Sequence, residues 1–268
     1  MSLQPMRLQS SASPTPGDSY VQSFARGLAV LRSFGHDAPA PTLSEVAERT
    51  GLTRAGARRI LLTLLQLGYV SADGRQFRLT AKVLDLGYAY LSSLPLWSHA
   101  QPALKELADD LRLSCSATVL DGDDIVYVVR LSAHKTMSIN LGIGSRLPSY
   151  CTAMGRVLLA GLDPLLLPQR LDKMARLKLT PHTVVETTRL LDIIGDARRQ
   201  GWCLVSEELE TGLVSIAAPI TGRDGKVVAA VNLSGQVGNT PLAALLERSL
   251  PRLLATAAGV STLVRLQS

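Results

Sequence analysis

The 268-residue chain lacks most of the patterns that mark enzymes, metal sites and membrane proteins. Its three cysteines, Cys115, Cys151 and Cys203, are odd in number and far apart, so they predict neither a disulfide framework nor paired metal ligands. None of the four histidines stands in an HExxH or similar pattern, and no GxSxG elbow, P-loop or CxxC occurs. No stretch approaches the roughly 18 uninterrupted apolar residues of a membrane helix. We therefore expect a cytoplasmic protein with no metal, no cofactor and no membrane contact.

Acidic residues are scarce relative to basic ones, and the first residues are poor in apolar side chains. The formal net charge is +6 with a pI near 9.5, which favours a polyanionic partner such as nucleic acid, although composition alone is a weak indication. Residues 1–19 are rich in Ser and Pro and lack the apolar core of a signal peptide. They are predicted to form a disordered tail.

Residues 20–80 carry the pattern of a winged helix-turn-helix domain. A first helix with Ser23 as a candidate cap precedes a second helix, which Thr42 and Glu45 open as a capping box. Gly51 ends that helix in a tight turn, and Thr53 caps a third helix that runs to about Gly68. The segment "VSADGRQFRL" then predicts a hairpin around a two-residue Asp-Gly turn, which would be the wing.

Arginines are concentrated where such a domain meets DNA. No acidic residue occurs from Thr50 to Ala72, and Arg54 and Arg58 lie four residues apart on one strip of the third helix. A planar guanidinium can pair with guanine edges or grip phosphate. A solvated basic face is the simpler alternative, but the cap, turn, helix and wing all agree with DNA binding. The candidate DNA contacts are Thr42, Thr53, Arg54, Ala55, Arg58, Arg59, Arg75 and Arg78.

Residues 81–97 are predicted to continue as a linker helix. Val83, Leu86, Tyr90 and Leu94 recur at three- and four-residue steps, which gives the helix one apolar stripe. That stripe has no obvious partner within so small a first domain. We expect it to carry a dimer contact; the alternative is a helix simply packed on the winged domain.

Residues 98–262 have the pattern of a mixed α/β sensor domain, with 263–268 as a short tail. "SCSATVLDGDDIVYVVRLS" alternates as two strands across a polar turn. "MSINLG" and the segments 202–206, 213–220 and 227–234 predict further strands, and helices are predicted over 152–161, 163–175, 187–200 and 240–262. Interleaved helices and strands of this kind favour an antiparallel or mixed sheet covered by helices. The overall fold class is therefore α+β.

Several separated motifs, in order, resemble the IclR family of bacterial transcription regulators. "FARGLAVLRSF", "TLSEVAERTGLTRAGARRILLTLLQLGYV" and "RLTAKVLDLGYAYLSS" resemble its winged helix and linker. "YCTAMGRVLLAGL", "QGWCLVSEELETGLVSIAAPI" and "GKVVAAVNLSG" resemble its effector domain. The resemblance covers about residues 20–262. It implies a GAF-like effector domain, a pseudo-palindromic DNA operator and a homodimer or homotetramer. "YVQSFARGLAVL" and "VLDGDDIVYVVR" are most similar to the subgroup that controls aromatic-acid breakdown through the β-ketoadipate pathway.

Two positions depart from the family pattern. Gly56 stands in the recognition helix, where glycine costs about 1 kcal/mol relative to alanine. Val205 and Ser206 stand where relatives often have acidic residues.

A candidate pocket for a small carboxylate follows from the second domain. "SYCTAMGRVLLA" starts a helix with small residues and bare amides, which is a natural site for a carboxylate, and nearby strands supply short polar groups. Matching positions in the family contact small organic acids. The candidate effector-binding residues are Thr152, Ala153, Met154, Leu213, Ser215, Asn232 and Ser234. The subgroup narrows the effector to an aromatic acid or a β-ketoadipate-pathway intermediate, with another small organic acid as the alternative.

An enzyme tethered to a winged helix is the less favoured reading. The GxG of "NLGIGSRLP" lacks a third glycine, and Cys151 is expected to be a small buried residue rather than an activated thiol. The carboxylates of "EELETG" are expected to form a polar strand end. A nucleic-acid binder without any ligand is a third alternative, which the size of the second domain disfavours.

Overall fold

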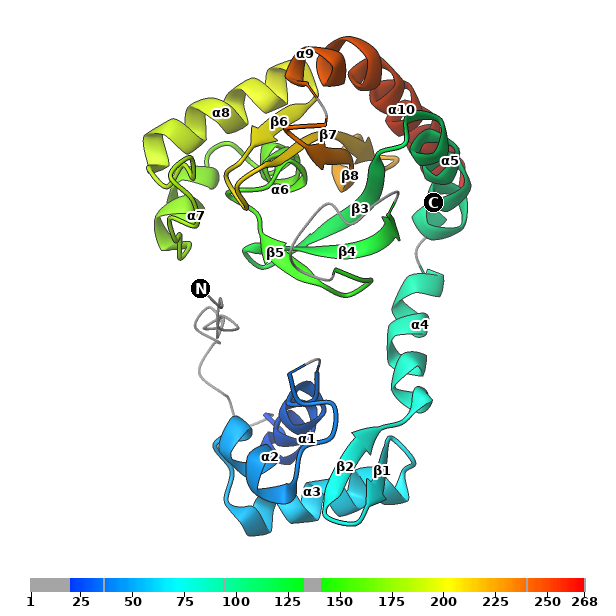
Figure 1. Cartoon of the computed structure of the whole chain (residues 1–268), viewed down its shortest axis with the longest axis vertical. Coiled ribbons are helices and arrows are strands. Elements are labelled where there is room, and N and C mark those ends of the chain that lie inside the picture. Colours follow the sequence, from blue (N-terminus) through cyan, green and yellow to red (C-terminus); the bar gives the residue numbers. More distant parts are fainter. Residues whose placement is uncertain (1–19, 36, 94, 133–140, 240, 268) are drawn as a thin grey trace. The chain divides into compact units, whose positions relative to one another are not determined.

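The computed structural model describes residues 20–35, 37–93, 95–132, 141–239 and 241–267. The chain divides into two compact units, Met1–Ser93 and Leu94–Ser268 (Figure 1). Each unit is described by itself. No helix in the described ranges is long and apolar enough to cross a membrane.

The first unit is a three-helix core with a hairpin. Its helices are α1 (Gln22–Arg32), α2 (Leu43–Thr50) and α3 (Arg54–Gln66). One face of each helix supplies the apolar side chains that meet in the centre. The buried core residues of this unit are Val30, Val46, Ala47, Ala57, Leu61, Leu64 and Val70.

The helix boundaries follow from local capping. The Thr42–Glu45 capping box is present, and Gly51 ends α2 at φ 66°, a left-handed conformation that costs glycine little. Thr53 caps α3. The predicted Ser23 cap is wrong, because α1 begins at Gln22 and Ser23 therefore lies inside the helix. Val21 is the N-cap residue and makes no side-chain hydrogen bond there.

The wing spans the predicted residues 70–79 and is largely exposed. Strands β1 (Val70–Asp73) and β2 (Gln76–Leu79) pair antiparallel, and Asp73 pairs with Gln76. The two turn residues are therefore the Gly-Arg pair at 74–75, one position later than predicted. Only the first residue of β1 is buried and Phe77 is half-buried, because the rest of the hairpin extends beyond the helices.

A short linker follows the wing. A 3-10 turn (Ala81–Val83) leads into α4 (Leu84–Ser93), which has no buried residue. The next helix, α5 (Pro95–Leu111), belongs to the second unit. Residues 95–97, which the sequence assigned to the linker helix, are therefore the start of α5. Four large apolar side chains of α4 are exposed, namely Leu84, Leu86, Tyr88 and Tyr90.

The second unit is built on one antiparallel sheet. Its strands are β3 (Ser114–Asp121), β4 (Asp124–Leu131), β5 (Arg146–Pro148), β6 (Cys203–Ser206), β7 (Leu213–Thr221) and β8 (Val227–Gln236). They lie in the order β5-β4-β3-β8-β7-β6. The predicted strand "MSINLG" lies mostly outside the described residues, and its last two residues, Leu141 and Gly142, are not in a strand.

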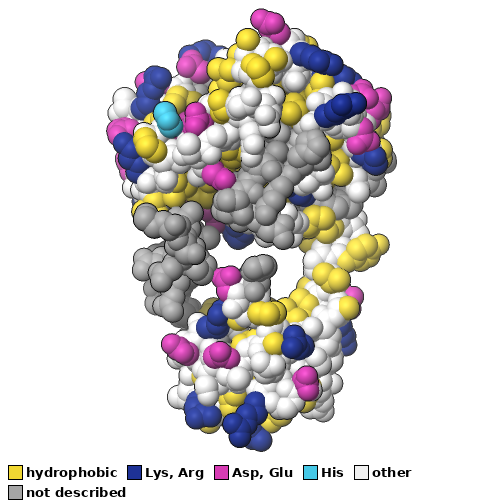
Figure 2. All heavy atoms as spheres, viewed as in Figure 1, with side chains coloured by type: hydrophobic (Ala, Val, Ile, Leu, Met, Phe, Trp, Pro, Cys, Tyr) yellow, Lys and Arg dark blue, Asp and Glu magenta, His cyan; other side chains and the backbone are white. Residues whose placement is uncertain are grey.

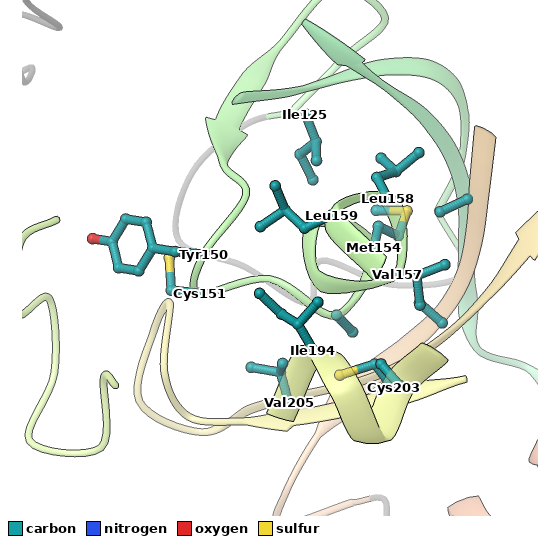
Figure 3. Packing of buried hydrophobic residues seen from close by; sticks show 14 of the residues in the cluster. Ile125, Tyr150, Cys151, Met154, Val157, Leu158, Leu159, Ile194, Cys203 and Val205 are labelled. Carbon is teal, nitrogen blue, oxygen red and sulfur yellow. The ribbon is translucent and has the colours of Figure 1, made fainter. Parts of the chain in front are cut away.

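Helices cover both faces of this sheet. On one face lie α6 (Ala153–Ala160), α7 (Leu167–Lys173) and α8 (Thr187–Gln200). The other face is covered by α5 and α10 (Leu250–Gln267), with α9 (Leu242–Ala244) and a π-helical turn (Leu245–Ser249) leading into α10 (Figure 1). The apolar cluster around α6 forms a large core (Figure 3).

The predicted C-terminal tail is wrong. The α10 helix continues to Gln267, and Val264 is buried against the unit. The buried side chains of Val260 and Val264 hold the last turns of the helix against the unit.

Candidate functional site

The first unit presents a basic surface along α3 and the wing. Figure 2 shows basic side chains at the bottom of this unit, where α2 and α3 lie in Figure 1. Five arginines are exposed and form no ion pair with any described residue: Arg54, Arg58, Arg59, Arg75 and Arg78. Their guanidinium groups are therefore open to an anionic partner.

Two of the predicted DNA contacts, Thr42 and Thr53, are also the N-cap residues of helices. The Thr42 hydroxyl donates to Glu45 Oε2 at 2.9 Å, and the Thr53 hydroxyl accepts from the Gly56 amide at 3.1 Å. Thr53 and Ala55 are exposed at the start of α3. A Cβ added at Gly56 would lie 3.2 Å from Thr53 Oγ1, so a glycine at this unusual position keeps the cap uncrowded.

A pocket lies between α6 and the sheet of the second unit. Its cavity volume is about 30 Å³, well below the roughly 300 Å³ and more of a typical small-molecule pocket, so lining side chains must move to admit an organic acid. All seven residues chosen from the sequence line it: Thr152, Ala153, Met154, Leu213, Ser215, Asn232 and Ser234. The structure adds six more lining residues: Tyr127, Arg130, Cys151, Val205, Glu208 and Leu209.

The N-terminus of α6 contributes free backbone amides to this pocket. Thr152 caps the helix, since its hydroxyl accepts from the Gly155 amide at 3.2 Å and donates to the Pro148 carbonyl at 3.0 Å. The amides of Ala153 and Met154 form no hydrogen bond with a described residue. A helix start with open N–H groups attracts negative charge.

The glycine at 155 sets how closely α6 approaches the preceding loop. A Cβ there would lie 2.1 Å from the Ser149 carbonyl oxygen, far inside any allowed contact. Only glycine permits this packing, which holds the start of α6 at the pocket.

Polar side chains on three neighbouring strands line up across the floor of the pocket. Ser116 on β3 is the register partner of Arg130 on β4 and of Asn232 on β8, so the three side chains share one face of the sheet. Arg130 Nη1 donates to Ser116 Oγ at 3.0 Å, and Asn232 Nδ2 donates to Ser215 Oγ at 2.9 Å.

Two buried atoms in this row have no partner among the described residues. They are Arg130 Nε, a donor, and Asn232 Oδ1, an acceptor. Buried polar groups are normally hydrogen-bonded, and an unmade bond costs about 1–3 kcal/mol. A ligand in the pocket would supply the missing partners.

A β-bulge explains why sequence reasoning missed Arg130. Simple alternation places Tyr127 and Arg130, three residues apart, on opposite faces of β4. The register shifts between Ala117 and Thr118 of β3, which pairs Thr118 with Tyr127. Both β4 side chains therefore reach the pocket, with the Arg130 guanidinium 5.8 Å from the centre of the Tyr127 ring.

The "EELETG" segment was also misread from sequence. Glu208 is only 7% exposed and forms a bidentate pair with Arg156 of α6, which is 1% exposed; both nitrogen–oxygen distances are 2.6 Å. Glu208 also accepts from the Val184 amide at 2.9 Å, and Arg156 Nε donates to the Tyr150 carbonyl at 2.8 Å. This buried pair fastens α6 to the loop before β7.

Cys151 lies in the pocket wall as a buried, protonated thiol. Burial raises its pKa from 9.0 to about 12. A neutral thiol is a poor nucleophile, so the geometry fits a lining residue. The described residues contain no group of three or more His, Cys, Asp or Glu placed to hold a metal ion.

Two family models match the chain. The model of the IclR helix-turn-helix domain matches residues 23–74, and that of the bacterial transcriptional regulator IclR C-terminal domain matches residues 88–262, which is more than half of the chain. The chain belongs to the IclR family.

Relatives within the IclR family cover most of the chain. The Pca regulon regulatory protein of Pseudomonas putida is 43% identical over 242 residues, which are 90% of this chain and 83% of the relative. The crystal structure of a transcriptional regulator from Rhodococcus sp. RHA1 has a TM-score of 0.83 and 48% identity, covering 91% of this chain and 98% of that one.

A third relative was solved with a ligand. It is the inducer-binding domain of the transcription factor PobR from Acinetobacter, a double mutant in complex with 3-hydroxybenzoic acid. It is 31% identical with a TM-score of 0.57, over 62% of this chain and 97% of that domain.

The IclR assignment confirms the predicted fold class and the reading as a DNA-binding transcriptional regulator rather than an enzyme. The curated relatives also match the predicted aromatic-acid catabolism subgroup.

Proposed function

We propose that this regulator binds a small aromatic carboxylate in the pocket between α6 and the sheet, and that binding changes its affinity for a DNA operator. The observation that carries the proposal is one pocket that combines open helix amides with unpaired polar atoms on the sheet.

The carboxylate is expected at the N-terminus of α6. The Ala153 and Met154 amides supply two donors, and the helix dipole favours negative charge there. Aromatic and aliphatic side chains form much of the remaining wall, including Tyr127, Leu209 and Leu213. This combination suits a flat ring that carries an acid group.

Relatives support an aromatic effector. The PobR inducer-binding domain is bound to 3-hydroxybenzoic acid, and the relative from Pseudomonas putida regulates the Pca regulon. An aliphatic intermediate of the β-ketoadipate pathway is the competing effector, because the same amides would bind its carboxylate.

The operator is expected to contact α3 and the wing. Arg54 and Arg58 stand near the start of the recognition helix, where side chains reach base edges in the major groove. Arg75 and Arg78 of the wing are expected to act mainly on phosphate, which would make their contribution sensitive to salt.

A homodimer or homotetramer would place two winged helices on a pseudo-palindromic operator. The exposed apolar side chains of α4 are the proposed dimer contact, since four large exposed apolar side chains on one short helix are uncommon on a free surface. Ligand would act by favouring one arrangement of the subunits, which requires different affinities for the two arrangements.

Isothermal titration calorimetry on the full chain tests the binding step. We expect saturable heat with 4-hydroxybenzoate, 3-hydroxybenzoate or protocatechuate, and loss of that heat in Ser234→Leu, which fills the pocket. Thr262→Leu on the exposed face of α10 is the matched control and should bind normally. If neither aromatic acids nor β-ketoadipate give heat or a thermal shift, the pocket is not a carboxylate sensor.

A further inference from the structure

The sheet side of the pocket has its own binding chemistry, separate from the α6 amides. Arg130 Nε offers a hydrogen bond and Asn232 Oδ1 can accept one, and neither atom has a partner among the described residues. Asn232 is 5% exposed, so water does not replace the missing partner freely.

The Asn232 amide is held by a hydrogen bond to Ser215 on the neighbouring strand. The Ser215 hydroxyl donates to the Leu233 carbonyl at 3.2 Å, and its oxygen accepts from the Asn232 side chain. Asn232 therefore presents Nδ2 to Ser215 at 2.9 Å. In this hydrogen-bonding arrangement Oδ1 is the unpaired atom of the amide.

Arg130 is held in a similar way. Its Nη1 donates to Ser116 Oγ, and its guanidinium lies against the Tyr127 ring. Arg130 and Asn232 are both in register with Ser116, so their backbones are two strand spacings apart, about 10 Å, and both side chains line the pocket. A ligand group lying over Ser116 would lie between them.

We propose that Arg130 and Asn232 together recognise a hydroxyl group on the effector ring, so that the preferred effector is a hydroxy-substituted aromatic acid. This inference rests on the proposed function, because it assumes that the acid group occupies the α6 amides. A hydroxyl oxygen accepts from Arg130 Nε while its proton is donated to Asn232 Oδ1.

Other ligand groups would satisfy at most one of the two unpaired atoms, Arg130 Nε and Asn232 Oδ1. A carboxylate only accepts, so it would serve Arg130 but oppose Asn232 Oδ1 with its negative charge. An unsubstituted ring would leave both atoms unpaired. Sites built to bond a substrate hydroxyl discriminate strongly against analogues without it, because their own polar groups are then left unsatisfied.

Affinities of matched acids for the full chain test the proposal. The probes are 4-hydroxybenzoate, 3-hydroxybenzoate, benzoate, 4-methylbenzoate, terephthalate and β-ketoadipate, measured by titration calorimetry. At least one hydroxybenzoate should bind about tenfold or more tightly than benzoate, 4-methylbenzoate and both dicarboxylates. If benzoate binds as tightly as the hydroxybenzoates, or a dicarboxylate binds more tightly, the proposed recognition of a hydroxyl group is wrong while the proposed function still stands. Absence of binding by every acid would overturn the proposed function as well.

Substitutions at Asn232 and Arg130 test whether these residues cause the preference for a hydroxylated ring. Asn232→Leu should remove most of the hydroxyl preference, measured as the ratio of hydroxybenzoate affinity to benzoate affinity, because it removes the acceptor and keeps the size. Arg130→Lys keeps the positive charge without the Nε donor, and it should also reduce the preference. Circular dichroism verifies folding, and Arg130→Lys carries the test if Asn232→Leu does not fold. A preference unchanged in every folded variant would contradict the assignment.

Discussion

Removing the charge of Glu208 should strongly destabilise the second unit. Glu208→Gln keeps the side-chain shape but leaves the Arg156 guanidinium, which is 1% exposed, without a counter-charge. Breaking a buried ion pair by removing one partner costs about 3–5 kcal/mol. For a unit of this size, 1 kcal/mol shifts the melting temperature by about 2–4 °C, so the expected fall is roughly 6–20 °C.

Tryptophan fluorescence during urea unfolding measures this effect in the right part of the chain. Both tryptophans belong to the Leu94–Ser268 unit. Asp109→Asn is the matched control, because the Lys105–Asp109 side chains are 67% and 66% exposed and such helix pairs contribute only about 0.3–0.5 kcal/mol.

The double variant Arg156→Met with Glu208→Leu separates charge burial from shape. Replacing both charges with apolar groups should be less harmful than removing one, because no uncompensated charge remains. If the free energy of unfolding of Glu208→Gln lies within about 1 kcal/mol of the wild-type value, the buried Arg156–Glu208 pair does not hold α6 in place.

Three further predictions concern other parts of the chain. Arg54→Ala with Arg58→Ala should weaken operator binding by about 1–3 kcal/mol for each residue that reads a base, measured by fluorescence anisotropy; unchanged affinity would exclude α3 as the recognition helix. Gly155→Ala should destabilise the second unit by about 1–3 kcal/mol or more in urea unfolding, because its Cβ would overlap the Ser149 carbonyl. Burial raises the pKa of all three thiols from 9.0 to about 11 or 12, so the folded state holds these protons longer than the unfolded state. This contribution to stability is complete below pH 9 and falls as the pH rises toward 12. Replacing the cysteines with serine should make this loss of stability at high pH smaller. Rapid labelling of the native thiols at pH 8 would contradict their burial.

Local signals in the sequence were sufficient for much of the first unit. The Thr42–Glu45 capping box and the left-handed Gly51 depend only on residues within one turn, so their spacing predicts them directly. Phe24 of α1 stands at helical spacing with Leu28 and Leu31, which are half-buried, but it is itself 68% exposed. Periodicity shows which face is apolar, and only the packed structure shows what covers it.

The site was predictable where it follows simple strand alternation. Ser215, Asn232 and Ser234 line the pocket as expected, because β7 and β8 are regular through these positions. Arg130 was missed because a bulge changes the face of β4 that it occupies. The Arg156–Glu208 pair joins residues 52 positions apart, and no local pattern reports such a contact.

Operator binding measured with and without ligand tests the central claim most directly. The full chain is titrated against an operator selected from random double-stranded DNA, in the absence and presence of saturating 4-hydroxybenzoate or protocatechuate. At least one acid should change operator affinity by about 5- to 150-fold, the usual range of coupling between sites. Ser234→Leu should bind the operator normally and lose the response. Specific operator binding that no aromatic acid alters, or a response that survives Ser234→Leu, would contradict a ligand-controlled regulator working through this pocket.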